Sequence, residues 1–309
     1  MRQPATTGVI PAVLTPVDGS GEPCFDLMSA HCRSLLEAGC GAIVLLGTTG
    51  EANSFSAPER MAILEGLVAA GMPASTFIVG TGCCAAADTI ALTKHALSVG
   101  ALRVLMLPPF YYKNVTDAGL IDAYSRVIDA IGDARLRVYL YRIPQISAID
   151  IKAPVADALL DRFGDVLAGI KDSTPEFEPV ADLCARFATR LDFLVGTERY
   201  LLKALALGAS GCVSATANAN AQAICELFKT KDPALQERVS AVRDMFEGLP
   251  VIAALKEYMA RSTGDARWRN ILPPLRPLSV EQAATLHNAR LRRSTIGRPL
   301  HSTEKDDVR

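Results

Sequence analysis

Short apolar runs alternate with longer amphipathic stretches along most of the chain. Eight of these runs are continuously apolar rather than alternating with polar residues, which is typical of strands buried on both faces. The runs are Val9–Thr15, Ala42–Leu46, Thr76–Gly80, Val104–Leu107, Arg137–Tyr141, Val166–Ile170, Phe193–Gly196 and Cys212–Ser214. Most of the intervening stretches have room for one helix, and the pattern predicts helices at Ala57–Ala70, Ala85–Ser98 and Ala118–Ile131.

Eight strand–helix units in one chain predict an α/β fold, a parallel (β/α)8 TIM barrel. A doubly wound open sheet is the alternative, but the regular spacing and the lack of a second compositional block favour the barrel. Beyond the eighth strand, helices are expected at 219–230, 233–248, 250–263 and 280–290. We therefore expect a barrel domain over 1–231, a C-terminal helical extension over 232–290 and a flexible tail over 291–309.

Composition and charge exclude several classes of protein. Half of the 309 residues are apolar and the formal net charge is −1, so neither intrinsic disorder nor the basic surface of a nucleic-acid-binding protein is expected. No apolar run reaches the roughly 18 residues that a membrane-spanning helix needs. Pro4 and Pro11 interrupt the apolar stretch near the N-terminus, so no signal peptide is expected there.

The cysteines and histidines show no metal-binding pattern. None of the eight cysteines forms a C-x-x-C motif, and most lie in apolar contexts typical of buried, reduced thiols. The four histidines are scattered along the chain. We expect a cytoplasmic protein without a metal site, a nucleic-acid partner or a membrane partner.

Polar residues follow several of the predicted strands, at the end of a barrel where active sites lie. The second strand is followed by the sequence Gly-Thr-Thr-Gly-Glu at 47–51. Its two glycines allow a sharp turn whose amides, together with the threonine hydroxyls, suit a carboxylate or phosphate. The alternative is an ordinary turn in which Glu51 caps the next helix.

Lys171 directly follows the sixth apolar run and is a candidate nucleophile. Apolar walls at the barrel mouth favour a neutral amine, the form that attacks a carbonyl to make a Schiff base. The alternative is a lysine that extends to solvent beside Asp172. Tyr139 and Tyr141 share one face of the fifth strand, where a tyrosine can transfer protons or simply pack.

Two further motifs carry weaker signals. The fourth strand leads into the aromatic segment Pro108–Tyr112, which by default is a packing or interface feature. Residues 80–85 fit the pattern G-x-G-x-x-A of a dinucleotide-binding loop, but no acidic residue ends the next strand, so a dinucleotide site is not expected.

Taken together, these motifs resemble the dihydrodipicolinate synthase / N-acetylneuraminate lyase family of pyruvate-dependent class I aldolases. The similarity runs from about Gly8 to about Leu278, with the motifs in the family's order and spacing. The matching segments are Leu14–Pro16, Gly47–Glu51, Pro109–Tyr112, Tyr141–Pro144, Gly169–Asp172 and Gly208–Ser214.

The resemblance implies a role for each matching residue. Lys171 would form the Schiff base with pyruvate or another 2-keto acid, and Tyr141 would be the general acid/base. Thr48 and Thr49, with the backbone of Gly47, would hold the carboxylate, while Gly196 and Val213 would line the pocket. No cofactor beyond the covalent imine is implied.

Family members are commonly homotetramers built as dimers of dimers, in which a tyrosine reaches across an interface to complete a proton relay with a threonine. Tyr111 is the candidate here, with Tyr112 as the alternative because the register is ambiguous by one residue. The threonine of that relay would be Thr48.

Two departures from the family pattern bear on the substrate. Where lysine-biosynthesis enzymes carry an arginine that grips the second substrate, this chain has Ile146, and Arg142 replaces an asparagine. A pocket for an anionic semialdehyde would then lack its cation, unless Arg142 supplies it. We therefore expect an aldolase acting on a 2-keto-3-deoxy sugar acid, or a related dehydratase, rather than a dihydrodipicolinate synthase. A catalytically silent keto-acid-binding member and a phosphate-binding barrel are the alternatives from other classes.

Overall fold

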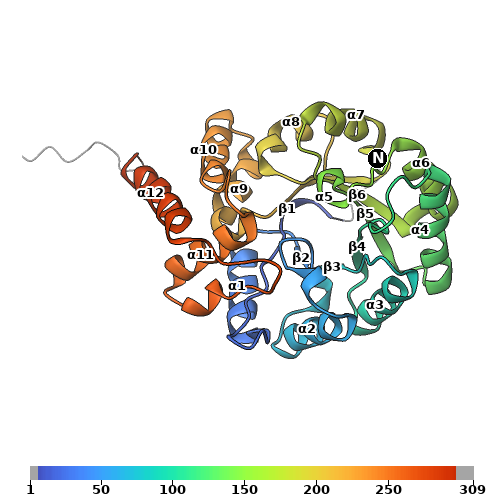
Figure 1. Ribbon diagram of the computed structural model, residues 1–309. Coiled ribbons are helices and arrows are strands. Elements are labelled where there is room, and N and C mark those ends of the chain that lie inside the picture. Colours follow the sequence, from blue (N-terminus) through green and yellow to red (C-terminus); the bar gives the residue numbers. More distant parts are fainter. Residues whose placement is uncertain (1–5, 297–309) are drawn as a thin grey trace, which may run out of the picture.

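The computed structural model describes residues 6–296 of the chain, with side chains described as far as Arg292. Within these residues, eight parallel strands form one sheet in the order β1-β8-β7-β6-β5-β4-β3-β2, surrounded by helices (Figure 1). A parallel bridge between Ala12 and Val44 brings the two ends of the sheet together into a nearly closed barrel. The strands are β1 (Gly8–Pro11), β2 (Ile43–Leu45), β3 (Phe77–Gly80), β4 (Arg103–Met106), β5 (Arg137–Arg142), β6 (Leu167–Asp172), β7 (Asp192–Val195) and β8 (Gly211–Ser214).

The helices alternate with these strands, which confirms the (β/α)8 barrel. The three individually predicted helices correspond to α2 (Ala57–Ala69), α3 (Ala86–Val99) and α4 (Asp117–Ile131). The short interval between β7 and β8 holds only a 3₁₀ turn, η4 (Glu198–Tyr200), and the short helix α8 (Leu201–Ala206). The remaining helices of the ring are α1 (Phe25–Glu37), α5 (Pro144–Ser147), α6 (Ala153–Phe163), α7 (Phe177–Phe187) and α9 (Ala217–Thr230).

Apolar side chains cover both faces of the sheet. One cluster lies inside the barrel and includes Ile10, Tyr139, Tyr141 and Val213, while a larger one lies between the strands and the outer helices. Gly169 on β6 makes room for the interior ring of Tyr139, because a Cβ at that position would lie 2.6 Å from ring atoms. Because side chains alternate along a strand, Tyr139 and Tyr141 of β5 both point into the barrel.

A C-terminal helical part packs beside α1 and α9, as predicted (Figure 1). It comprises α10 (Pro233–Asp244), α11 (Val251–Thr263), the 3₁₀ turn η5 (Ala266–Arg269) and α12 (Val280–Ile296). Trp268 is buried there in a third apolar cluster. Helix α12 continues past the predicted end at 290, and from residue 297 the predicted tail lies outside the described residues.

The structure also bears on the expectations for the cysteines and for membrane-spanning helices. All eight cysteines are free thiols, and most of them are buried. Within residues 6–296, no helix combines the length and the apolar character that crossing a bilayer would require.

Candidate active site

Tyr141 and Lys171 lie side by side at the carboxyl ends of β5 and β6. They are direct partners in the register of this parallel strand pair, and their place in the alternation turns both side chains into the barrel. Lys171 is only 4% exposed, and its Nζ lies 3.9 Å from the centroid of the Tyr141 ring. The structure thus brings together the candidate nucleophile and the candidate acid/base in a buried position.

The hydroxyl of Tyr141 connects β5 to the loop after β2. It lies 3.4 Å from the Oγ1 of Thr48, within hydrogen-bonding distance. Burial by itself raises the pKa of Tyr141, but the positive charge of Lys171 and hydrogen bonds from Thr48, Lys171 and Ser173 outweigh it and lower the pKa. These surroundings stabilise the phenolate, as a group that accepts and returns a proton requires.

The Gly47–Glu51 loop presents its amides and hydroxyls beside Tyr141. Among residues 6–296, the backbone amides of Thr48 and Thr49 have no hydrogen-bond acceptor in the protein. The Oγ1 of Thr15, just after β1, donates to the backbone oxygen of Gly50 at 2.8 Å and ties the loop to the barrel. The loop therefore offers two free donors to an anion bound next to Tyr141.

Glu51 does not cap the following 3₁₀ turn, η1 (Ala52–Ser54), as the alternative interpretation of this loop had it. Its side chain instead forms a buried ion pair with Lys256 of α11. Burial lowers the pKa of Lys256, and the charge of Glu51 opposes that shift. Lys256 could not be found from the sequence, because only the packing of α11 on the barrel brings it to this loop.

Ser173 is a site residue that was not predicted from the sequence. It follows Lys171 by two positions and lies against Gly196, where a Cβ would come within 2.1 Å of its Oγ. Gly196 thus leaves space for the Ser173 hydroxyl, one of the groups that lower the pKa of Tyr141. Val213 of β8 is buried in the same interior cluster as Tyr141. The period-2 pattern after Lys171 is the signal that would have identified Ser173.

Arg142 is not brought together with Tyr141 and Lys171. It follows Tyr141 on β5, so its side chain points away from the barrel interior. Its Nε donates to Asp150 at 2.6 Å and its Nη1 donates to Asp172 at 2.8 Å. The guanidinium that was predicted to bind substrate is therefore already paired with two carboxylates.

Tyr111 and Tyr112 lie on the surface after β4. Their side chains are 72% and 75% exposed, and their rings meet edge to face with centroids 5.3 Å apart. Neither ring is part of the buried cluster around Tyr141. In a single chain, these tyrosines are therefore free to contact another molecule.

Comparisons with known proteins identify the family of this chain. Residues 5–291 match the dihydrodipicolinate synthetase family. A DapA-like lyase from Chloroflexus aurantiacus is 34% identical over 294 residues, covering 91% of this chain and 95% of the relative. Dihydrodipicolinate synthase from Agrobacterium tumefaciens superposes with a TM-score of 0.85 at 30% identity, covering 93% of this chain and 99% of that one. YagE from Escherichia coli K12, whose structure was solved in complex with pyruvate, superposes with a TM-score of 0.83 at 26% identity, covering 93% and 98%.

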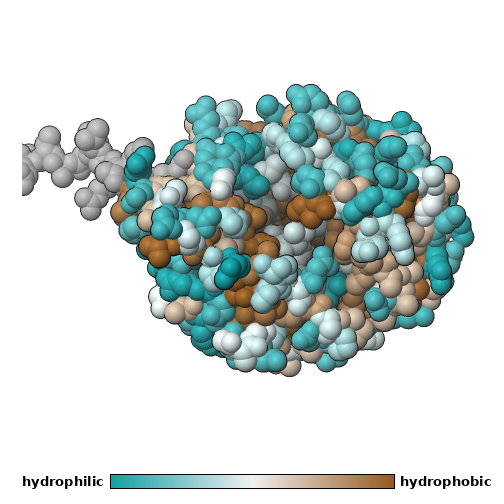
Figure 2. Space-filling model, viewed as in Figure 1, coloured by the Kyte–Doolittle hydropathy of each residue, from teal (hydrophilic) through white to brown (hydrophobic). Residues whose placement is uncertain are grey.

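The chain belongs to the dihydrodipicolinate synthetase family. Members of this family are lyases with pyruvate Schiff-base chemistry, and the chain is an enzyme of this class I aldolase/lyase type. The space-filling view, drawn from the same side as Figure 1, shows a hollow near the middle of this face with hydrophobic side chains beside it (Figure 2).

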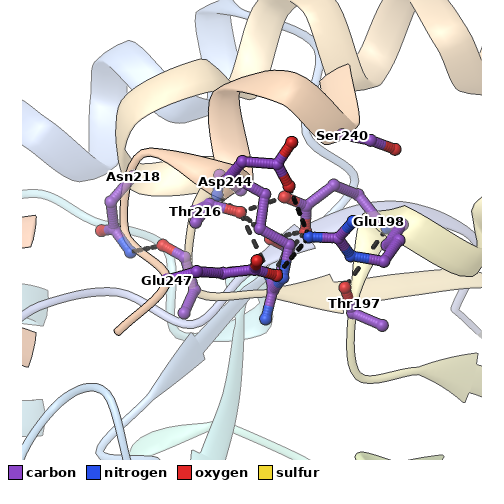
Figure 3. Close-up of polar contacts among 12 residues, drawn as sticks. Thr197, Glu198, Thr216, Asn218, Ser240, Asp244 and Glu247 are labelled. Carbon is purple, nitrogen blue, oxygen red and sulfur yellow. Dashed lines mark hydrogen bonds and ion pairs between the residues drawn. The ribbon is translucent and has the colours of Figure 1, made fainter. Parts of the chain in front are cut away.

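A buried carboxylate occupies the rim after β7 and β8, where many other barrel enzymes bind phosphate. Glu198 is 1% exposed and accepts hydrogen bonds from Ser214 at 2.6 Å, from Thr216, and from Arg243 of α10 at 3.1 Å (Figure 3). A negative charge at this position repels phosphate. The geometry therefore disfavours the phosphate-binding barrel that remained as an alternative.

The glycines of the G-x-G-x-x-A segment serve close packing between neighbouring loops. A Cβ on Gly80 would lie 2.0 Å from the backbone oxygen of Leu46, and one on Gly82 would lie 2.3 Å from the amide of Leu107. Arg60 of α2 also donates to the backbone oxygen of Gly80, at 2.8 Å. Packing thus accounts for these glycines without a dinucleotide.

Proposed function

We propose that this enzyme is a Schiff-base aldolase that cleaves or forms the bond between pyruvate and an aldehyde, with a 2-keto-3-deoxy sugar acid as its substrate. The observation that carries the proposal is the buried Lys171 amine against the ring of Tyr141, whose hydroxyl reaches Thr48. A nucleophile, a proton carrier and an anion-binding loop then meet in one pocket.

The mechanism assigns one task to each group. The substrate carboxylate binds the amides and hydroxyls of Thr48 and Thr49. The Nζ of Lys171 attacks the 2-keto carbon, and loss of water gives a protonated imine. In the cleavage direction, Tyr141 takes the proton of the C4 hydroxyl, the C3–C4 bond breaks, and its electron pair passes to the imine nitrogen as an enamine. Protonation of C3 and hydrolysis release pyruvate, so no metal or organic cofactor is required.

The substrate class follows from what surrounds the pocket. Ile146 is 62% exposed at the position of the arginine in lysine-biosynthesis enzymes, and Arg142 is paired with Asp150 and Asp172. A second anionic substrate would therefore lack a cation from either residue. YagE carries the provisional name 2-dehydro-3-deoxy-D-gluconate aldolase, which supports the sugar-acid assignment.

Oligomerisation completes the proposed site. We infer a homotetramer in which Tyr111 of one subunit enters the site of its neighbour and completes a proton relay with Thr48 and Tyr141. The exposure of Tyr111 supports this arrangement, because large aromatic side chains are enriched at protein interfaces. Tyr112 is the alternative donor, since the two side chains are nearly equally exposed.

Reductive trapping tests the proposal. Borohydride added with pyruvate is expected to inactivate the enzyme and to label Lys171, as peptide mass mapping would show. Lys171→Arg is expected to take no label, because a guanidinium stays protonated and cannot form the imine. Lys152→Arg is the matched control, since that lysine is solvent-exposed, and it should be trapped like the unchanged protein.

A panel of 2-keto-3-deoxy sugar acids, with pyruvate release as the readout, then tests the substrate. Trapping at Lys171 without turnover of any acid would identify a silent keto-acid binder. Release of water without pyruvate would identify a dehydratase. A folded protein that is not labelled at Lys171 would refute the proposal.

A further inference from the structure

Lys256 of α11 reaches the end of the Gly47–Glu51 loop from the C-terminal helical part. Its Nζ forms an ion pair with Glu51, and each of the two side chains is 1% exposed. Nζ also donates a hydrogen bond to the backbone oxygen of Asn270 at 2.7 Å. The other carboxylate oxygen of Glu51 accepts from the backbone amide of Leu272 at 3.1 Å. The Glu51 side chain is therefore held by groups that lie outside the ring of strands.

The backbone of the loop needs such an anchor. Glu51 has a φ of 57°, in the left-handed region that is unfavourable for a residue with a Cβ. Leu46, at the other end of the loop, has a φ of 56°. Conformations of this kind persist only where surrounding contacts over-determine them. The Thr15 hydrogen bond fixes the barrel side of the loop, and the Lys256 ion pair fixes the side that faces α11.

We propose that Lys256 is a positioning residue: by holding Glu51, it fixes the backbone that presents Thr48 and Thr49 to the substrate carboxylate. This inference rests on the proposed function, in which that loop binds the carboxylate. Lys256 acts only through Glu51 and touches no reacting atom. The pair suits this task because a buried carboxylate that loses its cation must move, take up a proton or recruit water.

Amide hydrogen exchange of the segment 46–55 tests the structural part of the proposal. Lys256→Met removes the cation at similar volume and is expected to speed exchange of this segment at least about tenfold, because the left-handed Glu51 loses its anchor. Glu51→Gln keeps an acceptor for the Leu272 amide and removes the charge at almost no change in volume, so it provides the same comparison if Lys256→Met does not fold. The double variant Lys256→Met/Glu51→Gln has no buried charge at this position. Its exchange is expected to be slower than in either single variant, so the effects of the two substitutions should be strongly non-additive.

Glu257→Gln is the matched control. Glu257 is the next residue on α11 and is also buried, but it pairs with Arg261 and Arg269 instead of the loop. This variant should leave exchange of 46–55 unchanged. Equal loss of protection in Glu257→Gln and Lys256→Met would show general loosening of the C-terminal part and overturn the proposal. Unchanged protection in Lys256→Met would also overturn it, as would additive effects of Lys256→Met and Glu51→Gln.

Borohydride trapping provides the functional readout. In Lys256→Met, the pyruvate concentration for half-maximal trapping should rise about tenfold while the maximal trapping rate changes less than about threefold, since binding and not chemistry is affected. An unchanged half-saturation would contradict the proposed role of the loop. If the unchanged protein is itself not trapped at Lys171, the proposed function fails, whereas the exchange comparison still decides whether Lys256 holds the loop.

Discussion

At the scale of single residues, the hydroxyl of Tyr141 is the centre of the proposed chemistry. Its ring is buried, yet Lys171, Thr48 and Ser173 together lower its pKa. Tyr141→Phe keeps the ring against Lys171 and removes only the proton carrier. We expect kcat to fall by about 10²–10⁴-fold, the usual loss for general acid–base catalysis.

Steady-state pyruvate release measures this effect. Tyr124→Phe is the matched control, because Tyr124 is equally buried but lies on α4, where its hydroxyl donates to the backbone oxygen of Met106. That variant should turn over like the unchanged enzyme. A normal rate in Tyr141→Phe would remove Tyr141 from the mechanism.

The sequence identifies individual site residues when their position on a strand determines their direction. Tyr141 and Lys171 end buried strands, so their meeting at the barrel rim could be predicted. The same alternation places Arg142 on the opposite face from Tyr141, where it pairs with Asp172. The pairing of Arg142 with Asp150, like that of Glu51 with Lys256, depends on loops and helices whose packing no local pattern encodes.

At the scale of elements, capping side chains mark some of the predicted helices but not all, since α3 and α11 were predicted although neither has a side-chain cap. Ser56 closes a capping box on α2, and Thr116 and Asp232 cap α4 and α10. In contrast, α1, α6 and α7 have no side-chain cap, and these three helices were not predicted individually. Their first turns carry only an acidic residue or a proline, so the repeating barrel pattern is what implies them.

The network around Glu198 joins the ends of β7 and β8 to α10. Arg243→Met leaves the buried Glu198 carboxylate with hydroxyl partners only. The free energy of unfolding is expected to fall by about 2–3 kcal/mol, the value typical of a hydrogen bond to a charged group. Urea denaturation measures it. Arg199→Met breaks the more exposed pairs with Asp244 and Glu247 in the same network and should cost about 1 kcal/mol or less. Equal losses in the two variants would contradict this assignment.

His31 connects α1 to α9 and η5, and it makes stability depend on pH. It lies 2.9 Å from the Oδ1 of Asn218, and its ring meets Trp268 edge to face. Burial lowers the pKa of His31, and the Asn218 hydrogen bond opposes this shift without reversing it. The unfolded chain therefore binds a proton more readily than the folded one. The stabilisation is complete above the unfolded pKa of about 6.5 and is lost as the pH falls towards the folded value.

Urea midpoints measured between about pH 7 and about pH 5 test this dependence, since the unfolded histidine titrates in that range. In His31→Gln, the urea midpoint is expected to fall less steeply as the pH is lowered, because no group at that position then takes up a proton. His95→Gln, at a more exposed histidine paired with Glu65, should retain the slope of the unchanged protein. An identical slope in His31→Gln would assign the dependence to other groups.

At the scale of the whole molecule, the C-terminal helical part does more than cover the barrel. Lys256 and the amide of Leu272 reach the loop after β2, while Arg243 reaches Glu198 after β7. The barrel could be predicted because eight similar units repeat. These long-range contacts could not, since each joins one particular side chain to a loop far away in sequence. The rim of the site is thus stabilised from outside the ring of strands.

Complementation between subunits tests the proposed assembly. If Tyr111 serves the site of a neighbouring subunit, Lys171→Arg and Tyr111→Phe chains can complete one another, because a mixed pair contains one site with both Lys171 and Tyr111. Random pairing across a two-fold interface makes about a quarter of all sites complete. Co-refolded mixtures should therefore recover about that fraction of the unchanged activity, well above either variant alone. Recovery with Tyr112→Phe in place of Tyr111→Phe would assign the role to Tyr112. A mixture no more active than the average of its parents would mean that each chain completes its own site.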